Sequence, residues 1–111
     1  KISKSMGDID WTMDAVSIER LVRGLNPWPS AFTRWNGKML KIWEAKVLPD
    51  PDVKLPCGSV ISASDEGLKI QTGAGVLCVT SLQLEGKKRM DTAAFLRGYQ
   101  VAAGSMMERS E

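Results

Sequence analysis

Histidine is absent from the sequence, and with it the commonest general base and metal ligand of proteins. Serine-histidine and cysteine-histidine nucleophile pairs are therefore excluded. Cysteine is scarce: Cys57 and Cys78 fit neither a CxxC motif nor a disulfide framework, so two free thiols in a reducing compartment are expected. No apolar run approaches the roughly 18 residues of a membrane-spanning helix, and no signal-peptide segment opens the chain. The composition therefore predicts no membrane contact and no catalytic residues.

What is present is the composition of one soluble globular domain. The 111 residues are 43% hydrophobic and 25% charged, which is enough for a single core. The net charge of +2 is mild and requires no polyanionic partner. The chain opens on Lys1 without an initiator methionine, so we interpret it as a piece of a longer protein whose chemistry takes place elsewhere.

The N-terminal part predicts one helix after a linker. Residues 1–11 are mostly polar and are expected to be an interdomain linker, anchored at its end by Trp11. Asp14 is suited to cap a helix, and apolar residues then recur at i, i+3, i+4 and i+7 from Ile18. Because the residue before a proline is disfavoured in the α region, Asn26-Pro27 is expected to end this helix.

From Phe32 onward the pattern is typical of strands separated by tight turns. Asn36-Gly37 is a strong hairpin signal, and the long run over residues 38–48 that follows it alternates unevenly, which indicates a bulged or bent strand. Turns that contain glycine separate three further expected strands, over residues 59–63, 68–72 and 76–84.

The C-terminal part predicts one short helix. Asp91 is expected to cap a helix over residues 92–97, and residues 101–111 are expected to form a frayed C-terminal tail. These elements predict a mainly β fold over residues 12–100. We expect an OB-like barrel of five to six strands with one N-terminal helix and one short C-terminal helix.

Three motifs that suggest chemistry have simpler explanations. Gly73-Ala74-Gly75 lacks the spacing of a phosphate-binding loop and leads into a strand. Asp65-Glu66 precedes a glycine between two strands, which is typical of a turn. Cys57 and Cys78 lack partners at the spacing of a metal site. Neither a phosphate loop, a carboxylate pair nor a metal site is therefore predicted.

Basic residues are concentrated in two segments. Four fall within the first hairpin with only Glu44 among them, and three follow the last strand. Acidic residues concentrate elsewhere, so the domain can present a basic face to a phosphate backbone. The alternative is an ordinary solvated strand face. The candidate phosphate-binding residues are Arg34, Lys38, Lys41, Lys46, Lys87, Lys88 and Arg89.

Two of the four tryptophans lie beside these basic residues. If Trp35 and Trp43 are exposed, their rings can stack nucleic-acid bases. If they are buried, they pack the barrel or seal a domain interface. Trp28 stands between two prolines and is expected to be structural.

An Asn-Pro-Trp-Pro box at residues 26–29 and a Gly-Lys-Lys-Arg-Met run at residues 86–90 occur in the same chain. Lys1-Ile2-Ser3-Lys4, Leu40-Lys41-Ile42-Trp43 and Phe95-Leu96-Arg97-Gly98 complete the pattern. Over roughly residues 1–100 the sequence resembles the C-terminal domain of the methionyl-tRNA formyltransferase family. Asp91 stands where the family often has serine, which is an equivalent helix cap.

The resemblance implies an OB-like barrel appended to an N-terminal Rossmann-like catalytic domain. That domain would bind the donor 10-formyltetrahydrofolate and carry the catalytic residues, so this chain is expected to hold no cofactor and to be inactive alone. The implied parent enzyme formylates the amino group of methionyl initiator tRNA in translation initiation, as a cytoplasmic monomer. The implied task of this domain is to position tRNA through non-specific backbone contacts of the seven basic residues named above.

Three alternatives remain open. The C-terminal domain of a sugar-nucleotide N-formyltransferase shares the implied fold, but its substrate needs no long basic track such as residues 87–89. A free-standing OB module that binds single strands disagrees with the linker-like start of the chain. The third alternative is a domain that only braces the catalytic domain, and a measured salt dependence of tRNA binding separates these cases.

Overall fold

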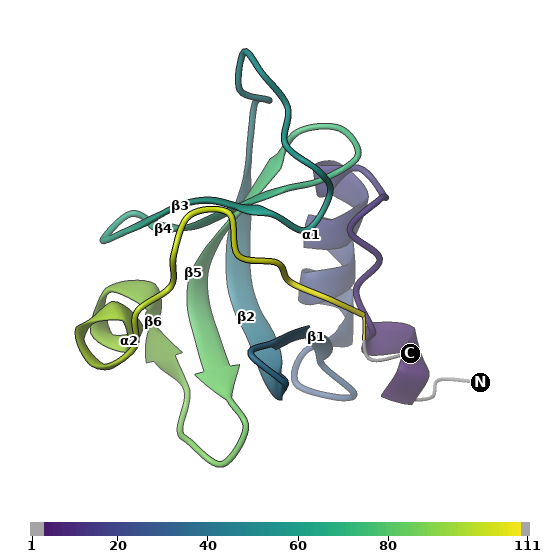
Figure 1. Ribbon diagram of the computed structural model, residues 1–111. Coiled ribbons are helices and arrows are strands. Elements are labelled where there is room, and N and C mark those ends of the chain that lie inside the picture. Colours follow the sequence, from purple (N-terminus) through teal and green to yellow (C-terminus); the bar gives the residue numbers. More distant parts are fainter. Residues whose placement is uncertain (1–3, 110–111) are drawn as a thin grey trace.

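The computed structural model describes residues 4–109, and strands dominate it (Figure 1). The helical elements are η1 (Lys4–Gly7), α1 (Ala15–Leu25) and α2 (Thr92–Gly98). The strands are β1 (Ala31–Trp35), β2 (Lys38–Leu48), β3 (Val60–Ser64), β4 (Gly67–Gln71), β5 (Val76–Leu84) and β6 (Met90–Asp91). The predicted mainly β fold with one N-terminal and one short C-terminal α-helix is confirmed. The sequence pattern did not indicate η1 or β6.

The strands form one antiparallel sheet with the long strands β2 and β5 at its centre. The order is β1-β2-β5-β4-β3, and β6 pairs with β5. The register between β2 and β5 shifts on both sides of Glu44, which confirms the predicted irregularity of this strand. The bent sheet surrounds a core of apolar side chains that includes Leu40, Ile42, Leu68, Ile70, Leu77 and Leu82, all with no exposed surface.

The turn between β1 and β2 sets which side chains face outward. Asn36 and Gly37 both have positive φ, 56° and 77°, as a two-residue hairpin turn requires. The register pairs Trp35 with Lys38 and Arg34 with Met39. Because side chains alternate along a strand, Trp35 faces the core, and Arg34 and Met39 face outward.

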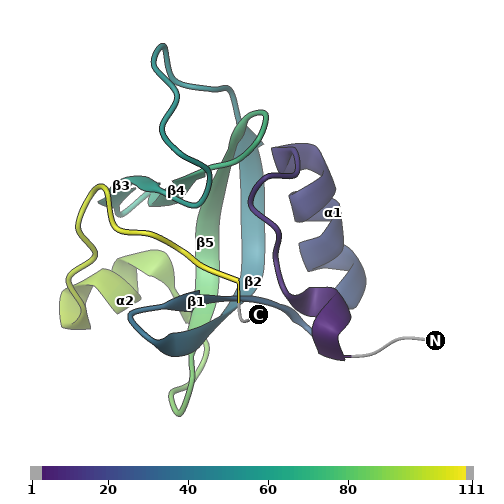
Figure 2. The same ribbon diagram turned by 45° about the vertical axis from the view of Figure 1, so that its right-hand side comes forward.

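The C-terminal segment, residues 101–109, lies between the two edges of the sheet (Figures 1 and 2). Its Glu108 exchanges two backbone hydrogen bonds with Arg34 of β1, at 2.8 and 2.9 Å. On its other side, the Val60 amide of β3 donates to the Ser105 carbonyl at 2.8 Å. The six strands alone do not close the barrel, and this segment bridges the gap between β1 and β3.

The prediction of a frayed C-terminal tail is therefore wrong for residues 101–109. Val101 is 8% exposed, and Met107, which belongs to the core, is 2% exposed. Residues 110 and 111 lie outside the described residues. The segment pairs through backbone groups with distant parts of the chain. Such pairing requires no alternation of apolar and polar side chains, so the sequence does not reveal it.

The predicted cap at the start of α1 and the predicted end of this helix before Pro27 are both confirmed. The Asp14 carboxylate accepts hydrogen bonds from the Ser17 hydroxyl at 2.6 Å and amide at 3.2 Å, and these bonds lower the pKa of Asp14. The helix ends at Leu25, where Asn26 turns to an extended conformation. The Asn26 side-chain amide donates to the Ile42 carbonyl at 3.2 Å, which ties this end of α1 to β2.

The packing of α1 differs in detail from the prediction. Ile18 and Val22 are each 1% exposed, and the Trp11 indole N–H donates to the Thr33 hydroxyl at 3.0 Å. Leu21, at the i+3 position of the apolar pattern, packs against the core as expected but is only partly buried. Trp28 was expected to be structural, but its side chain belongs to the surface, since the residue is 63% exposed.

We expect Ile18→Ala to lower the free energy of unfolding by about 2–5 kcal/mol, because it empties a buried aliphatic site against the barrel. Urea denaturation monitored by tryptophan fluorescence measures this loss. Leu21→Ala is the matched control and is expected to cost less than half as much. Equal losses at the two positions would contradict the assignment of the buried face.

Candidate nucleic-acid interface

The two basic segments lie on adjacent strands. β2 carries Lys41 opposite Gln83 of β5, and residues 87–89 follow β5 directly. Arg89 joins the two segments: its Nη2 lies 3.1 Å from the Glu44 carboxylate of β2, and its Nε–H donates to the Ser81 hydroxyl of β5 at 3.0 Å. The structure thus brings the two clusters together across the outer side of the sheet.

Trp43 organises the surface between the two segments. The Arg89 guanidinium carbon lies 4.7 Å from the centre of the Trp43 ring, a cation–π arrangement. The Trp43 indole N–H donates to Gln83 Oε1 at 2.9 Å, and Gln83 Nε2 donates to the Lys87 carbonyl at 2.9 Å. These contacts fix the path of the loop. Trp43 lies partly under Arg89 and is not a free stacking platform.

Outward-facing side chains extend this surface to the end of the hairpin. Arg34 Nη1 donates to the Gly37 carbonyl at 2.9 Å, which holds the guanidinium at the β1–β2 turn. Lys41 lines a hollow of about 230 Å³ with Gln83 and Glu85. The Glu85 carboxylate accepts the Met39 amide hydrogen at 2.5 Å, so this acid is tied to the end of β2.

Lys38 lies apart from the other candidate residues, and Lys46 lies at their margin, in a groove with Trp43 and Glu44, which contact Arg89. Lys38 pairs with Trp35, whose ring packs against Phe95 at a centroid distance of 5.7 Å, so Lys38 is on the side of β2 opposite to Lys41. Lys46 lies beyond the β2 bulge, opposite Cys78. We define the basic face as Arg34, Lys41, Lys87, Lys88 and Arg89.

Sequence reasoning missed one lysine that accompanies Lys46. The register places Lys46, Cys78 and Lys69 in one row across β2, β5 and β4. Burial raises the pKa of the Cys78 thiol, while the two nearby lysines act in the opposite direction. Lys69 alternates with buried Leu68 and Ile70 in the sequence, which indicates that it faces away from the core. The row itself depends on strand order, which no local pattern contains.

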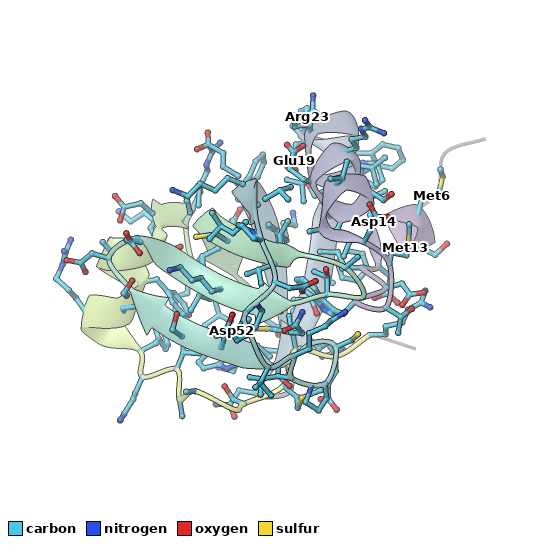
Figure 3. The ribbon with its side chains drawn as sticks, turned by 90° about the horizontal axis from the view of Figure 1, so that it is seen from above. Met6, Met13, Asp14, Glu19, Arg23 and Asp52 are labelled. Carbon is cyan, nitrogen blue, oxygen red and sulfur yellow. The ribbon has the colours of Figure 1, made fainter. Side chains whose placement is uncertain are left out.

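Arg23 of α1 was also missed. A groove of about 320 Å³ between α1 and β2 is lined by Arg23, Trp43 and Lys46. Arg23 lies 2.7 Å from the Glu19 carboxylate one helical turn away, and its side chain is 67% exposed (Figure 3). The i,i+4 spacing is typical of such an ion pair, but only the packing of α1 shows that it lies beside the bulge of β2.

The remaining expectations concern aromatic, thiol and metal sites. Trp35 is 8% exposed and contacts Phe95 and Tyr99, so its packing role is confirmed. Cys57 and Cys78 are unpaired. Within residues 4–109, no group of three or more histidine, cysteine or acidic side chains is placed to hold a metal ion. No helix in this described part is both long enough and apolar enough to span a membrane.

The fold defines a small barrel-like β domain. The family described as "Formyl transferase, C-terminal domain" matches residues 1–100. The chain therefore belongs to this family of formyl transferase C-terminal domains.

Two curated relatives share one name. A methionyl-tRNA formyltransferase of Agathobacter rectalis is 54% identical over 104 residues, covering 94% of this chain and 33% of that protein. One of Lachnospira eligens is 47% identical over 110 residues, covering 96% of this chain and 35% of that protein. The chain thus spans about a third of the length of these relatives.

Among solved structures, HypX from Aquifex aeolicus in complex with tetrahydrofolic acid superimposes with a TM-score of 0.67. The sequence identity is 21%, and the match covers 95% of this chain and 21% of HypX. At this identity the likeness concerns the fold alone.

Proposed function

We propose that this chain is the tRNA-positioning C-terminal domain of a methionyl-tRNA formyltransferase. In the proposed parent reaction, the formyl group of 10-formyltetrahydrofolate is transferred to the amino group of methionyl initiator tRNA. The folate donor and the reacting amino group of the tRNA meet at the catalytic domain, and the domain described here supplies no chemical step. The names of the relatives and the C-terminal position of the family support this assignment.

The main support for a tRNA-binding role is that Arg89 connects the two basic segments. The Arg89 side chain reaches Glu44 and Ser81 on two neighbouring strands, so the loop at residues 87–89 is held beside Lys41. Glu44 and Glu85 lie among the five cations of the basic face and accept hydrogen bonds from within the domain, and exposed Glu108 pairs with Arg34 through the backbone, so five cations face three acids. The face therefore keeps an excess of positive charge for phosphates.

Binding on this face contributes to catalysis by positioning. Contacts to phosphates set the position and register of a nucleic acid and carry little base identity. Holding the tRNA body in this way raises the effective concentration of the aminoacylated end at the catalytic domain. Recognition of the initiator tRNA is accordingly assigned to the rest of the enzyme.

The salt dependence of tRNA binding to this chain tests the proposal. With about four phosphate contacts, each contributing about −0.7 to −0.9, the expected slope of log K against log salt is about −3. Initiator and elongator tRNAs are expected to bind almost equally. Lys41→Ala is expected to flatten the slope by nearly one unit.

Lys38→Ala is the matched control, because Lys38 lies on the same strand but on its opposite side. It is expected to leave the slope almost unchanged. Binding without salt dependence, or none at all in low salt, would favour the brace-only domain over the tRNA-positioning one.

A further inference from the structure

A second surface, distinct from the basic face, lies where the described chain begins. A groove of about 530 Å³ runs between η1 and α1, and we call it the N-terminal groove. Met6, Met13, Leu21 and Leu25 supply its apolar lining. Met6 and Met13 are 46% and 45% exposed, and both lie on the same side of the molecule near the start of α1 (Figure 3). Exposed apolar side chains that gather in a groove are typical of an interaction surface.

The charges around the N-terminal groove differ from those of the basic face. Arg109 lies 3.9 Å from the Asp8 carboxylate and 3.8 Å from the Asp10 carboxylate, and all three residues line the groove. Hydrogen bonds from the Thr12 side chain and amide lower the pKa of Asp10. Arg20 also lines the groove, so two arginines balance the two acids. A groove without net positive charge does not attract a phosphate backbone, which favours a protein partner over RNA.

Gly24 leaves the α1 side of the groove open. It lines the groove from α1, and a Cβ atom built on it meets nothing within 4 Å. Glycine in a helix costs up to about 1 kcal/mol relative to alanine, and no neighbour among residues 4–109 requires it here. A helix surface without a side chain allows another backbone to approach closely.

We propose that the N-terminal groove is the docking site of the formyltransferase catalytic domain, an inference that rests on the proposed function. In the relatives, the region matched by this chain is the C-terminal third, so the other two thirds precede it. The wall of the groove is η1, the first described element, so a domain that precedes it is tethered beside the groove. Tethering raises the effective concentration of two domains, so a modest apolar contact is sufficient for docking.

The test uses the full-length formyltransferase that ends in this chain. The double variant Met13→Glu/Gly24→Gln places a charge and a side chain in the groove. The matched control, Val53→Glu/Gly98→Gln, makes the same changes at an exposed loop valine and at a helix glycine with open space around it. Differential scanning calorimetry and the rate of proteolysis at the interdomain junction are measured for both.

The wild type and the control are expected to unfold in one calorimetric transition. The groove variant is expected to show two transitions and at least tenfold faster cleavage of the junction. Its C-terminal domain, produced alone, is expected to melt no lower than the wild-type domain, because glutamine favours a helix more than glycine does. This measurement separates lost docking from lost folding.

Groove and control variants that behave alike would overturn the docking proposal. Loss of a concentration-dependent dimer would instead assign the groove to a second copy, and lost tRNA affinity with normal proteolysis would assign it to RNA. Either result also overturns it. The salt slope of tRNA binding, measured on the same proteins, reports on the basic face separately, so failure of the tRNA-binding role is recognised independently of failure of docking.

Discussion

Removal of residues 101–111 is expected to abolish cooperative folding of the domain. Truncation of buried Met107 costs about 2–5 kcal/mol. Each backbone hydrogen bond lost at the β1 and β3 edges contributes about 0.5–1.5 kcal/mol, and the pairs at Arg34 and Val60 are among those lost. The combined loss approaches the roughly 5–15 kcal/mol that keeps a domain of this size folded. Two unpaired strand edges are also left open to aggregation.

Near-UV circular dichroism and thermal unfolding of the shortened chain measure this effect. A finer comparison uses two adjacent methionines: Met107 is 2% exposed and Met106 is 43% exposed. Met107→Ala is expected to lower the melting temperature by several degrees, and Met106→Ala by much less. A truncated chain that melts as cooperatively as the full chain would show that the segment is only an accessory to the barrel.

This segment also illustrates what a sequence pattern contains and what it does not. Asn36-Gly37 and the caps at Asp14 and Asp91 were predictable, because each depends on φ preferences or hydrogen bonds within a few residues. The pairing of Glu108 with Arg34 joins residues far apart in the chain through backbone groups, which no side-chain periodicity reports. Trp28 was misassigned for a related reason, since neighbouring prolines restrict the backbone but do not determine burial.

The candidate site was predictable as a set of residues and not as a surface. The charge clusters identified Lys41 and residues 87–89, but strand alternation, which separates Lys38 from Lys41, requires the register of the hairpin. The contribution of Arg89 depends on Trp43 and Glu44, and sequence spacing does not bring these side chains together. Strand order likewise places Lys69 in one row with Lys46, on the other side of Cys78, which explains why that lysine was missed.

The basic face and the N-terminal groove are expected to contribute to different properties of the parent enzyme, namely tRNA binding and domain docking. The basic face is expected to act only when tRNA is present, and its contribution weakens as salt screens the phosphates. The N-terminal groove has apolar lining from Met6 and Met13, so its contact is expected to be much less sensitive to salt. Changes in the basic face should therefore alter tRNA kinetics without altering the stability of the domain pair.

Neutralising the basic face at three positions is accordingly expected to have the largest effect on activity. In the full-length enzyme, Lys41→Ala/Lys87→Ala/Lys88→Ala should raise the KM for tRNA roughly tenfold to a hundredfold, because each solvent-exposed ionic contact contributes up to about 1 kcal/mol. The salt slope of kcat/KM should flatten by about two units. Arg89 is left unchanged in this variant, because its contacts with Trp43 and Glu44 also hold the loop in place.

The KM for the folate donor is expected to remain at the wild-type value, because the variant leaves the catalytic domain intact. Lys38→Ala combined with Arg97→Ala is the control: Lys38 lies on the opposite side of β2, and Arg97 is exposed in the last turn of α2. The control should change the KM for tRNA less than twofold. If the triple variant and the control show the same KM and the same salt dependence, the basic face does not contact tRNA, and the domain serves the enzyme through its docking surface alone.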